Sequence, residues 1–318
     1  MLFGILKIYA RLAIKIYCRK IIINKPEWLK AKGPLLLACN HPNSFLDGII
    51  LTTLFEENIY SLARGDAFQK KYDKLLRWLH LLPVYRTSEG VENLSYNYTT
   101  FAVCQEVFAR GGLVIIFSEA GTKNEWRLRP LKKGTARLAI STWQKGIDLK
   151  VVPVGLNYNT FRNFGKNVFI NFGEPLDKEA ILQHTSDGLL FSSFNEQLKE
   201  QLQALVYEIN PADKKKMNEK LFIRQPLLKR ILLALPALLG LIVHAPLYFA
   251  AKWITKIYFD NDHFDAVVAS LLTLSYPLYL LLFCITAEAF FHGTFALGIL
   301  FLMPFSAWTC VQLKNQLD

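Results

Sequence analysis

Residues 35–47 read LLLACNHPNSFLD, and this stretch decides the fold. Its first five residues form an uninterrupted apolar run, which is typical of a strand buried on both faces of a sheet. A turn containing Pro42 follows, and a helical pattern then extends from Phe45 to Phe55. A buried strand that passes directly into a helix is the building unit of an α/β domain with a parallel or mixed sheet.

The same alternation of apolar runs and helical stretches continues as far as Pro211. The predicted strands are Leu35–Cys39, Tyr60–Ala63, Val114–Phe117, Val151–Leu156 and Val168–Phe172. The predicted helices are Phe45–Phe55, Lys70–Leu81, Asn93–Ala109, Lys133–Lys145 and Leu189–Tyr207. We therefore expect an α/β domain over residues 29–212, with a mixed central sheet and flanking helices. Its chemistry should lie where strands pass into helices.

The composition combines a net charge of +11 with 52% hydrophobic residues over 318 positions, which excludes a disordered chain. The hydrophobicity is most concentrated in residues 231–313, which contain three nearly uncharged stretches, Ile231–Ala251, Ala266–Ala287 and Gly293–Val311. Each is close to the roughly 20 residues that a helix needs to cross a bilayer. We expect a transmembrane region of two to three spans rather than buried core helices, since no polar face is left for water. Pro236 and Pro246 favour a kinked or re-entrant first segment.

The positive charge is concentrated at the start of the chain. Residues 1–33 carry eight basic side chains and a single acid, Glu27. Four of these cations recur every fourth residue among apolar neighbours, at Lys7, Arg11, Lys15 and Arg19. This spacing predicts an amphipathic helix over residues 1–28 that lies in a membrane interface with its cations toward anionic headgroups. The alternative is an ordinary surface helix of a soluble domain.

A second basic cluster occupies a linker at residues 213–230, directly before the first apolar stretch. The positive-inside rule places this linker and the α/β domain on the cytoplasmic face of the membrane. We do not expect nucleic-acid binding, because both clusters adjoin apolar segments and no groove-reading motif accompanies them. Five widely spaced cysteines show no metal-ligand spacing, so we expect reduced thiols and no zinc site.

His41 and Asp47 form the first candidate site. On a continuous helix, residues six apart point in different directions, but the turn at Pro42 and Asn43 allows the imidazole to fold back over the helix start. A carboxylate there would accept from one ring nitrogen and leave the other as a base. The alternative is a capping box, Ser44-x-x-Asp47, with a purely structural role.

A second strand also ends in a small-residue turn, Ser118-Glu119-Ala120-Gly121-Thr122. Backbone N–H groups in such a turn, together with nearby cations, suit anion binding. The cations are Lys123, Arg127, Arg129, Lys132 and Lys133. The alternative is a hydrophilic turn with solvated charges.

Together these segments resemble, in order and spacing, the lysophospholipid and glycerolphosphate acyltransferases, a family that includes the 1-acylglycerol-3-phosphate acyltransferases. The four matching segments are Asn40–Asp47, Leu82-Pro83-Val84-Tyr85-Arg86, Phe117–Thr122 and Val151–Val154. Two features depart from the usual pattern. Five residues rather than four separate His41 from Asp47, and Ala120 stands where glycine is usual.

The resemblance implies that His41 is the general base on an acceptor hydroxyl and that Asp47 orients it. It implies an acceptor site formed by Arg86, Glu119, Ala120, Gly121 and Thr122, with Lys132 as a further contact. It also implies no metal and no cofactor, with acyl-coenzyme A or acyl-carrier protein as co-substrate. The expected acceptor is a lysophospholipid, foremost 1-acyl-glycerol-3-phosphate, and the bilayer is the expected partner.

Other functions remain open at this point. The acceptor is alternatively glycerol-3-phosphate or an amino-acid-based lysolipid. A thioesterase or lipase would normally need a Gly-x-Ser-x-Gly nucleophile, which the chain lacks. A catalytically silent membrane adaptor would not need both His41 and Asp47.

Overall fold

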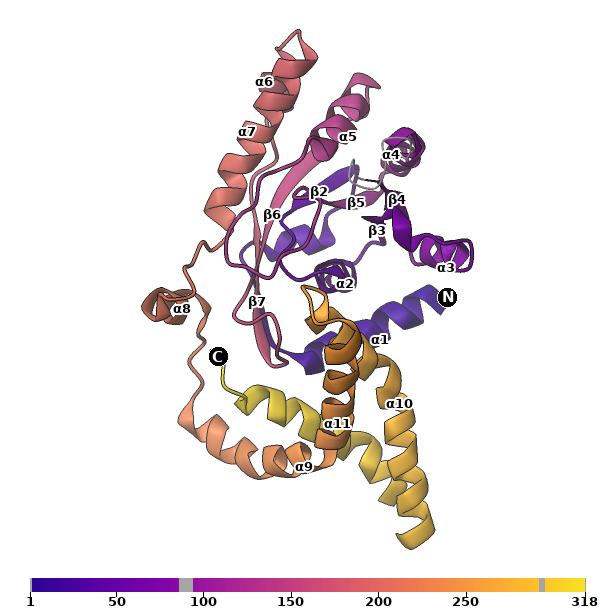
Figure 1. Ribbon diagram of the computed structural model, residues 1–318, viewed down its shortest axis with the longest axis vertical. Helices are drawn as coiled ribbons and strands as arrows, with labels where there is room; N and C mark the ends of the chain where they lie inside the picture. The colour runs from indigo at the N-terminus through magenta and orange to yellow at the C-terminus, as the bar shows by residue number, and fades with distance from the viewer. Residues whose placement is uncertain (1, 86–93, 292–294, 318) are drawn as a thin grey trace.

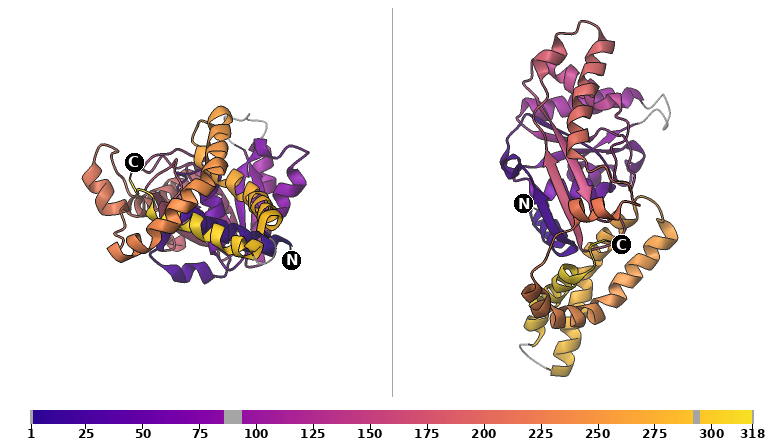
Figure 2. Two further views of the ribbon diagram at one scale, coloured as in Figure 1. Left: turned by 90° about the horizontal axis from the view of Figure 1, so that it is seen from below. Right: turned by 90° about the vertical axis from the view of Figure 1, so that its left-hand side faces the viewer.

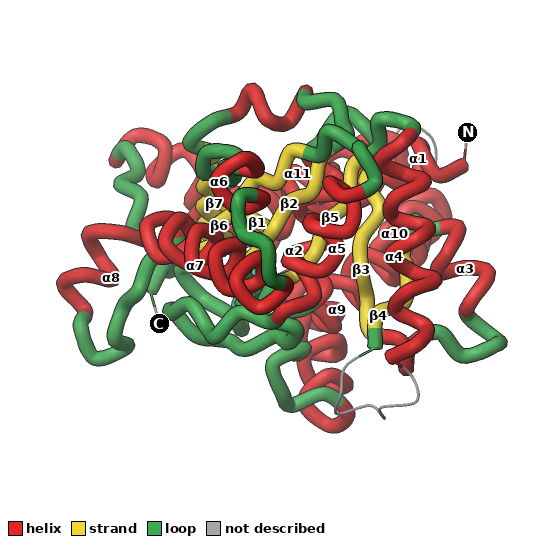
Figure 3. The backbone as a smooth tube through the Cα atoms, turned by 90° about the horizontal axis from the view of Figure 1, so that it is seen from above, coloured by secondary structure: helices red, strands yellow, loops and turns green. Residues whose placement is uncertain are grey.

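The computed structural model describes residues 2–85, 94–291 and 295–317. Its centre is a seven-stranded sheet in the order β1-β7-β6-β2-β5-β3-β4 (Figures 1 and 3). Neighbouring strands are parallel, except that β6 and β7 run antiparallel. The mixed sheet that the sequence predicts is therefore present. The strands are β1 (Cys18–Ile23), β2 (Leu35–Cys39), β3 (Ile59–Arg64), β4 (Leu81–Val84), β5 (Leu113–Phe117), β6 (Lys150–Tyr158) and β7 (Lys166–Phe172).

Helices cover both faces of this sheet. One face is covered by α1 (Leu2–Tyr17), α2 (Phe45–Leu54) and the first turns of α10 (Phe264–Phe291). The other is covered by α4 (Leu94–Ala109), α5 (Lys133–Gln144), α6 (Lys178–Leu182) and α7 (Asp187–Leu205). The remaining helices are α3 (Asp73–Trp78), α8 (Lys214–Leu221), α9 (Leu227–Tyr258) and α11 (Phe295–Leu313), with short 3-10 turns at Pro26–Lys30 and Gly65–Ala67.

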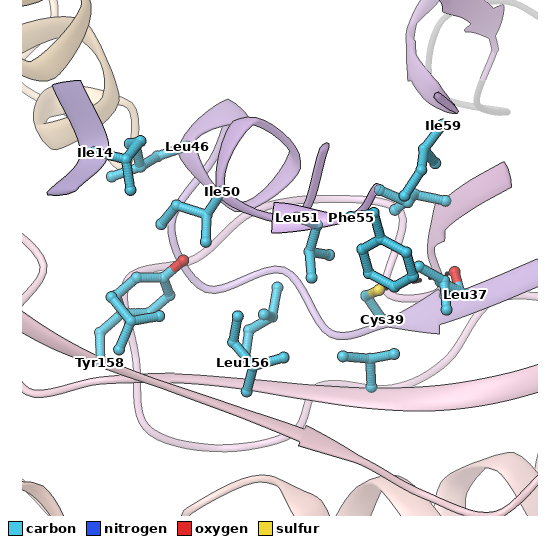
Figure 4. Packing of buried hydrophobic residues seen from close by; sticks show 14 of the residues in the cluster. Ile14, Leu37, Cys39, Leu46, Ile50, Leu51, Phe55, Ile59, Leu156 and Tyr158 are labelled. Carbon is cyan, nitrogen blue, oxygen red and sulfur yellow. Dashed lines mark hydrogen bonds between the residues drawn. The ribbon is translucent and has the colours of Figure 1, made fainter. Parts of the chain in front are cut away.

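Strand β2 shows why an apolar run without alternation belongs at the centre of this fold. Successive side chains of a strand point to opposite faces of the sheet. Leu35, Leu37 and Cys39 enter the core beneath α2, whereas Leu36 and Ala38 enter the core beneath α4 and α5. Figure 4 shows the first of these cores, in which the hydroxyl of Tyr158 is directed toward α2. Both faces of β2 are therefore dry.

The five predicted strands are present, and so are four of the predicted helices, with small shifts at their ends. The helix predicted over Lys70–Leu81 is wrong in length, because α3 covers only Asp73–Trp78. His80 has a positive φ of 60°, a conformation that a helix cannot continue through. Leu81 then begins β4, a short edge strand that the sequence pattern does not reveal.

The N-terminal segment also differs from the prediction of one helix over residues 1–28. Helix α1 ends at Tyr17, and Cys18–Ile23 form strand β1, which pairs in parallel with β7 at one edge of the sheet. A run of isoleucines from Ile21 to Ile23 favours this extended conformation, because β-branched side chains lose rotamer freedom in a helix. The start of the chain is therefore built into the α/β domain.

The cation stripe of α1 does not face away from the protein as predicted. Lys7 Nζ donates to the carbonyl oxygens of Glu56 and Glu57, at 3.2 and 2.8 Å, just beyond the end of α2. Arg11 donates to the carbonyls of Thr53 and Phe55, also at the end of α2. Carbonyl groups at a helix C-terminus lack internal partners and carry partial negative charge. Lys7 and Arg11 therefore satisfy the end of α2 instead of turning toward headgroups.

Arg19, the last cation of the stripe, does the same for α11. Its side chain is buried and donates to the carbonyl oxygens of Gln312 and Lys314. Burial lowers the pKa of Arg19 to about 10. Within this stripe Lys15 alone is exposed. The outward face of α1 is instead apolar, with Leu2, Ile5, Ile8 and Leu12 more than half exposed.

The apolar C-terminal region forms three helices below the α/β domain (Figure 2). By length and composition, α9 and residues Phe264–Phe290 of α10 are long and apolar enough to cross a membrane, and Leu297–Leu313 form a shorter apolar helix. Pro236 and Pro246 lie inside α9, which changes direction along its length (Figure 1). Gly240 allows α9 and α11 to approach closely, because a Cβ there would lie 2.5 Å from the carbonyl oxygen of Ser306.

Both ends of α9 are joined to the rest of the protein. Near its start, Lys229 Nζ donates to Gln312 Oε1 of α11 at 2.7 Å, and Gln312 in turn donates to the carbonyl of Arg19 in β1. Just beyond its end, Asp262 accepts a hydrogen bond from the backbone N–H of Asn124 at 3.0 Å. The end of α9 therefore contacts the α/β domain directly, whereas its start is linked to the domain through α11.

Candidate active site

His41 lies at the carboxyl end of β2, the middle strand of the sheet. The preceding residue, Asn40, extends the ladder with its side chain: its Nδ2 donates to the Leu156 carbonyl at 3.0 Å and its Oδ1 accepts from the Leu156 N–H at 2.7 Å. The imidazole stacks on Phe117, with ring centroids 3.8 Å apart. The side chain of His41 retains 15% of its exposure, so one edge of the ring is open at the end of the sheet.

His41 and Asp47 are hydrogen-bonded, with Nδ1 and Oδ2 separated by 2.8 Å. The chain reverses between them because Ser44 adopts φ 56° and ψ −152°, and α2 begins at the next residue. This reversal is what allows residues six apart to meet. No described residue bonds to Nε2 of His41, so that nitrogen is the one available to a substrate.

The capping-box alternative is not what the structure shows. Ser44 is the N-cap of α2, but its side chain makes no capping hydrogen bond. The carboxylate of Asp47 accepts from the backbone N–H of Asn43 at 2.9 Å instead of reaching back to Ser44. Asp47 is thus directed at the turn that carries His41.

Tyr158, at the end of β6, is the third partner of Asp47. Its hydroxyl donates to Asp47 Oδ1 at 2.6 Å, and both side chains are fully buried. Burial, and secondarily the charge of Asp47, raises the pKa of Tyr158 well above its usual value, so the phenol stays protonated as a donor. Sequence reasoning missed this residue, because an apolar strand 111 positions away carries no local sign of the contact.

Glu119, just after β5, joins the backbone at the end of β2 to the loop before α5. Its Oε2 accepts from the N–H of His41 at 3.0 Å, and its Oε1 accepts from the N–H of Arg129 at 2.8 Å. Burial raises the pKa of Glu119, although these two hydrogen bonds and the charge of Arg129 oppose the shift. Both carboxylate oxygens are therefore engaged by main-chain amides, which makes Glu119 a support of the turn.

The other residues of the second turn lie directly beside the first. Thr122 Oγ1 accepts from the N–H of Ser44 at 2.8 Å, which ties the two turns together. Arg129 donates to the carbonyl of Gly121 at 2.9 Å. Ala120 has a positive φ of 51°, which explains why glycine suits this position better. The structure thus brings together the sequence-predicted residues of both turns.

Arg86 and Lys132 complete the predicted contacts. Arg86 lies outside the described residues. The backbone N–H of Lys132 donates to the carbonyl of Ser118 at 2.8 Å, and its side chain is exposed at the start of α5. No described acid pairs with Lys132.

A further set of residues comes from the segment between α9 and α10. His263 and Asp265 contact the turn that carries His41, and Asp262 accepts from Asn124, just after the second turn. Sequence reasoning missed them, because it assigned the whole segment to a membrane anchor. The only available signal was their polarity within an otherwise uncharged region. Over the described part of the chain, no group of three or more His, Cys, Asp or Glu side chains is arranged to hold a metal ion.

Residues 20–157 match the family described as Acyltransferase. Glycerol-3-phosphate O-acyltransferase 1 of Saccharomyces cerevisiae is 31% identical over 83 residues, which are 25% of this chain and 11% of the yeast protein. The crystal structure of the 1-acyl-sn-glycerophosphate (LPA) acyltransferase PlsC from Thermotoga maritima aligns with a TM-score of 0.45 and 16% identity. That alignment covers 64% of this chain and 79% of the other.

The matched region runs from β1 to the end of β6 and contains both turns described above. It includes the hydrogen-bonded pair of His41 and Asp47 as well as Glu119. Over residues 20–157, this chain is therefore similar to the acyltransferase family.

Proposed function

We propose that this protein is a membrane-bound O-acyltransferase that moves a fatty acyl chain from a thioester to a hydroxyl of a glycerolipid acceptor. The observation that carries the proposal is the 2.8 Å pair of His41 Nδ1 and Asp47 Oδ2, placed at the end of the central strand. An imidazole held through Nδ1 presents Nε2 as a base. The family match over the same residues supports this use of the pair.

In the proposed reaction the acceptor hydroxyl attacks the thioester carbonyl while His41 Nε2 takes the hydroxyl proton. Asp47 stabilises the imidazolium that forms. A carbon–oxygen bond is made, the tetrahedral intermediate collapses, and the carbon–sulfur bond breaks. The thiolate leaves with the proton returned by His41, so atoms and charge balance and no covalent enzyme intermediate is needed.

The turn after β5 supplies groups for the charges that develop. The backbone N–H groups of Gly121 and Thr122 have no hydrogen-bond partner among the described residues, so they are available as donors to an oxyanion. Of the cations near this turn, Lys123 pairs with Asp262 and Arg127 pairs with Glu125. Lys132, which no described acid neutralises, remains available to a phosphate. The sequence motif adds Arg86 to the same role.

The favoured acceptor is 1-acyl-glycerol-3-phosphate, because the motifs resemble those of lysophosphatidate acyltransferases. Glycerol-3-phosphate is the second candidate, since the similar yeast protein is a glycerol-3-phosphate O-acyltransferase. The proposed donor is acyl-coenzyme A or acyl-carrier protein. We place the α/β domain on the cytoplasmic face of the membrane, where the basic linker at residues 213–230 would hold it.

The test compares His41→Ala with the wild-type protein in purified membranes. The substitution should lower acyl transfer by about 10²- to 10⁴-fold, because a positioned base contributes this much. His184→Ala is the matched control, since His184 lies between α6 and α7 on the opposite face of the sheet. Full transfer by the His41→Ala protein at equal expression would contradict the mechanism.

The acceptor is identified by a panel assayed with radiolabelled acyl thioester and thin-layer chromatography. We expect labelled product with 1-acyl-glycerol-3-phosphate and none with zwitterionic lysolipids. Product formed only with glycerol-3-phosphate would assign the first acylation step instead. Release of free fatty acid without an acylated acceptor would indicate a thioesterase and would overturn the proposal.

A further inference from the structure

The segment between α9 and α10, residues 261–265, lies against the turn that carries His41; we name it the α9–α10 corner. It holds three successive residues of that turn. Pro42 is held through Asn124, whose Nδ2 donates to the Pro42 carbonyl at 2.8 Å and whose N–H donates to Asp262 at 3.0 Å. Asn43 donates to Asp265, and Ser44 is hydrogen-bonded to His263. A segment flanked by two apolar helices thus reaches the catalytic pair.

Asp265 is the most deeply placed of these contacts. It lies in the first turn of α10 and is fully buried, with Oδ2 accepting from Asn43 Nδ2 at 2.9 Å. Its Oδ1 accepts from the hydroxyl of Tyr17 at 2.6 Å, and it forms an ion pair with the fully buried Lys166. Lys166 balances the charge of Asp265, so the carboxylate is held as an acceptor in a dry environment.

Asn43 connects this carboxylate to the catalytic pair. Its side chain is bound to Asp265, while its backbone N–H donates to Asp47 Oδ2, the oxygen that also faces His41. Asn43 is fully buried, so water does not substitute for either contact. Any rotation of Asn43 away from Asp265 would carry its N–H away from Asp47.

The turn needs such external support because its backbone is strained. Ser44 adopts a positive φ of 56° with ψ −152°, a region that residues other than glycine avoid. A conformation of this kind persists only where surrounding contacts determine it. His263 at the Ser44 side chain, Thr122 at the Ser44 N–H and Asp265 at the neighbouring Asn43 provide these contacts.

We propose that the α9–α10 corner is part of the active site and that Asp265 is a positioning residue, which orients Asp47, and through it His41, by holding Asn43. This inference rests on the proposed acyltransferase function. It assigns the apolar C-terminal helices a role beyond attachment, because α10 seats its first turn beneath the catalytic pair. Displacement of α10 would therefore impair catalysis even in a protein with no substitution in residues 35–47.

The test measures kcat and KM for acyl transfer in Asn43→Ala, Asp265→Asn and the double variant. Each single variant should lower kcat by roughly 10- to 100-fold, the effect of a displaced catalytic group, with KM for the acyl donor unchanged. The double variant should be no slower than the worse single variant, because both substitutions break the same connection. Asp260→Asn is the matched control, since Asp260 pairs with Arg162 at the surface and lies outside the corner.

Asp265→Asn leaves Lys166 as an unbalanced buried charge and can prevent folding, so a second variant is needed. The combination Asp265→Leu with Lys166→Met removes both charges and keeps an apolar filling. This protein should fold and retain its melting temperature within a few degrees, yet its kcat should remain as low as that of Asn43→Ala. Wild-type kcat in the folded combination, or in Asn43→Ala, would overturn the inference.

Failure here is distinguishable from failure of the proposed function. If His41→Ala is inactive while the Asn43 and Asp265 variants keep full kcat, the acyltransferase proposal stands and only the positioning role is lost. If His41→Ala keeps full activity, the mechanism itself fails. If Asp260→Asn and Asp265→Asn lowered kcat equally, the cause would be the loss of a negative charge anywhere in this region, and the inference would also be overturned.

Discussion

At the scale of single residues, Ala120 adopts a backbone conformation that is unfavourable for a residue with a side chain. Its φ of 51° lies in the left-handed region, which costs a residue with a Cβ about 1–2 kcal/mol. The turn tolerates this cost because it must direct the backbone of Gly121 and Thr122 beside the turn that carries His41. Thr122 is bonded to Ser44, so the backbone at this point cannot relax independently.

Replacing Ala120 with glycine should therefore stabilise the protein. We expect Ala120→Gly to raise the free energy of unfolding by up to about 1 kcal/mol, because the strain relieved exceeds the entropy that glycine loses on folding. Thermal unfolding in detergent measures the effect. Ala102→Gly is the control: Ala102 is exposed in α4, and the same change there should destabilise by about 1 kcal/mol. A loss of stability in both variants would contradict the interpretation of the turn.

At the scale of elements, the docking of α1 on α2 shows what its cations do. Arg11 donates to the carbonyls of Thr53 and Phe55, which a helix end leaves unsatisfied. Lys15 belongs to the same sequence stripe, but it is exposed and has no partner among the described residues. In an interfacial helix with its cations toward headgroups, Arg11 and Lys15 would both bind lipid. If the cations instead cap the end of α2, Arg11 stabilises the protein and Lys15 does not.

Arg11→Ala should lower the free energy of unfolding by about 1–2 kcal/mol, because it removes charge-assisted hydrogen bonds at the end of α2. Lys15→Ala should change it by less than about 0.5 kcal/mol. Chemical denaturation of the two variants in the same detergent provides the comparison. If the two variants were equally stable and both bound anionic vesicles more weakly than the wild-type protein, both residues would be assigned to headgroup binding instead.

At the scale of the whole molecule, the C-terminal helices are joined to the α/β domain at more than one point. The α9–α10 corner and the segment after α11 contact it through Asp262 and Gln316. The start of α9 is linked to it indirectly, because Lys229 bonds to Gln312 of α11. A helix of 32 residues is long enough to cross a bilayer, but both of its ends are linked to the same domain, one directly and one through α11. We therefore expect α9 to follow the membrane surface beside the domain, while α10 and α11 extend away from it.

This arrangement predicts the sidedness of three positions. Cysteines introduced at Asn218, Asp260 and Asn315, which are all exposed, should react with a membrane-impermeant maleimide from one side of sealed vesicles. The wild-type chain is the control, because four of its five cysteines are buried and only Cys284 is partly accessible. Labelling of the Asp260 variant from the opposite side to the other two would show that α9 crosses the membrane.

Local sequence patterns were sufficient for much of the fold. The short apolar runs and the helical patterns between residues 29 and 212 predicted the central strands and most of the helices. The turn at Pro42 predicted the meeting of His41 and Asp47. These features depend on residues that are close together in the chain. Their conformational preferences do not require contacts between distant segments. Strand β1 was missed and the helix around α3 was predicted too long, because tertiary pairing and the positive φ of His80 outweigh the local pattern there.

The sequence by itself determined the α/β domain, the apolar C-terminal region and the residues that carry the acyltransferase signature. Only the tertiary structure decided what surrounds them. It placed Tyr158 on Asp47, turned Arg11 and Arg19 toward helix ends, and brought Asp265 beneath Asn43. The physical reason is distance along the chain: Asn43 and Asp265 are 222 positions apart. The carboxylate of Asp265 can hold Asn43 only because folding brings the hydrogen-bond donors of Asn43 and Tyr17 to it.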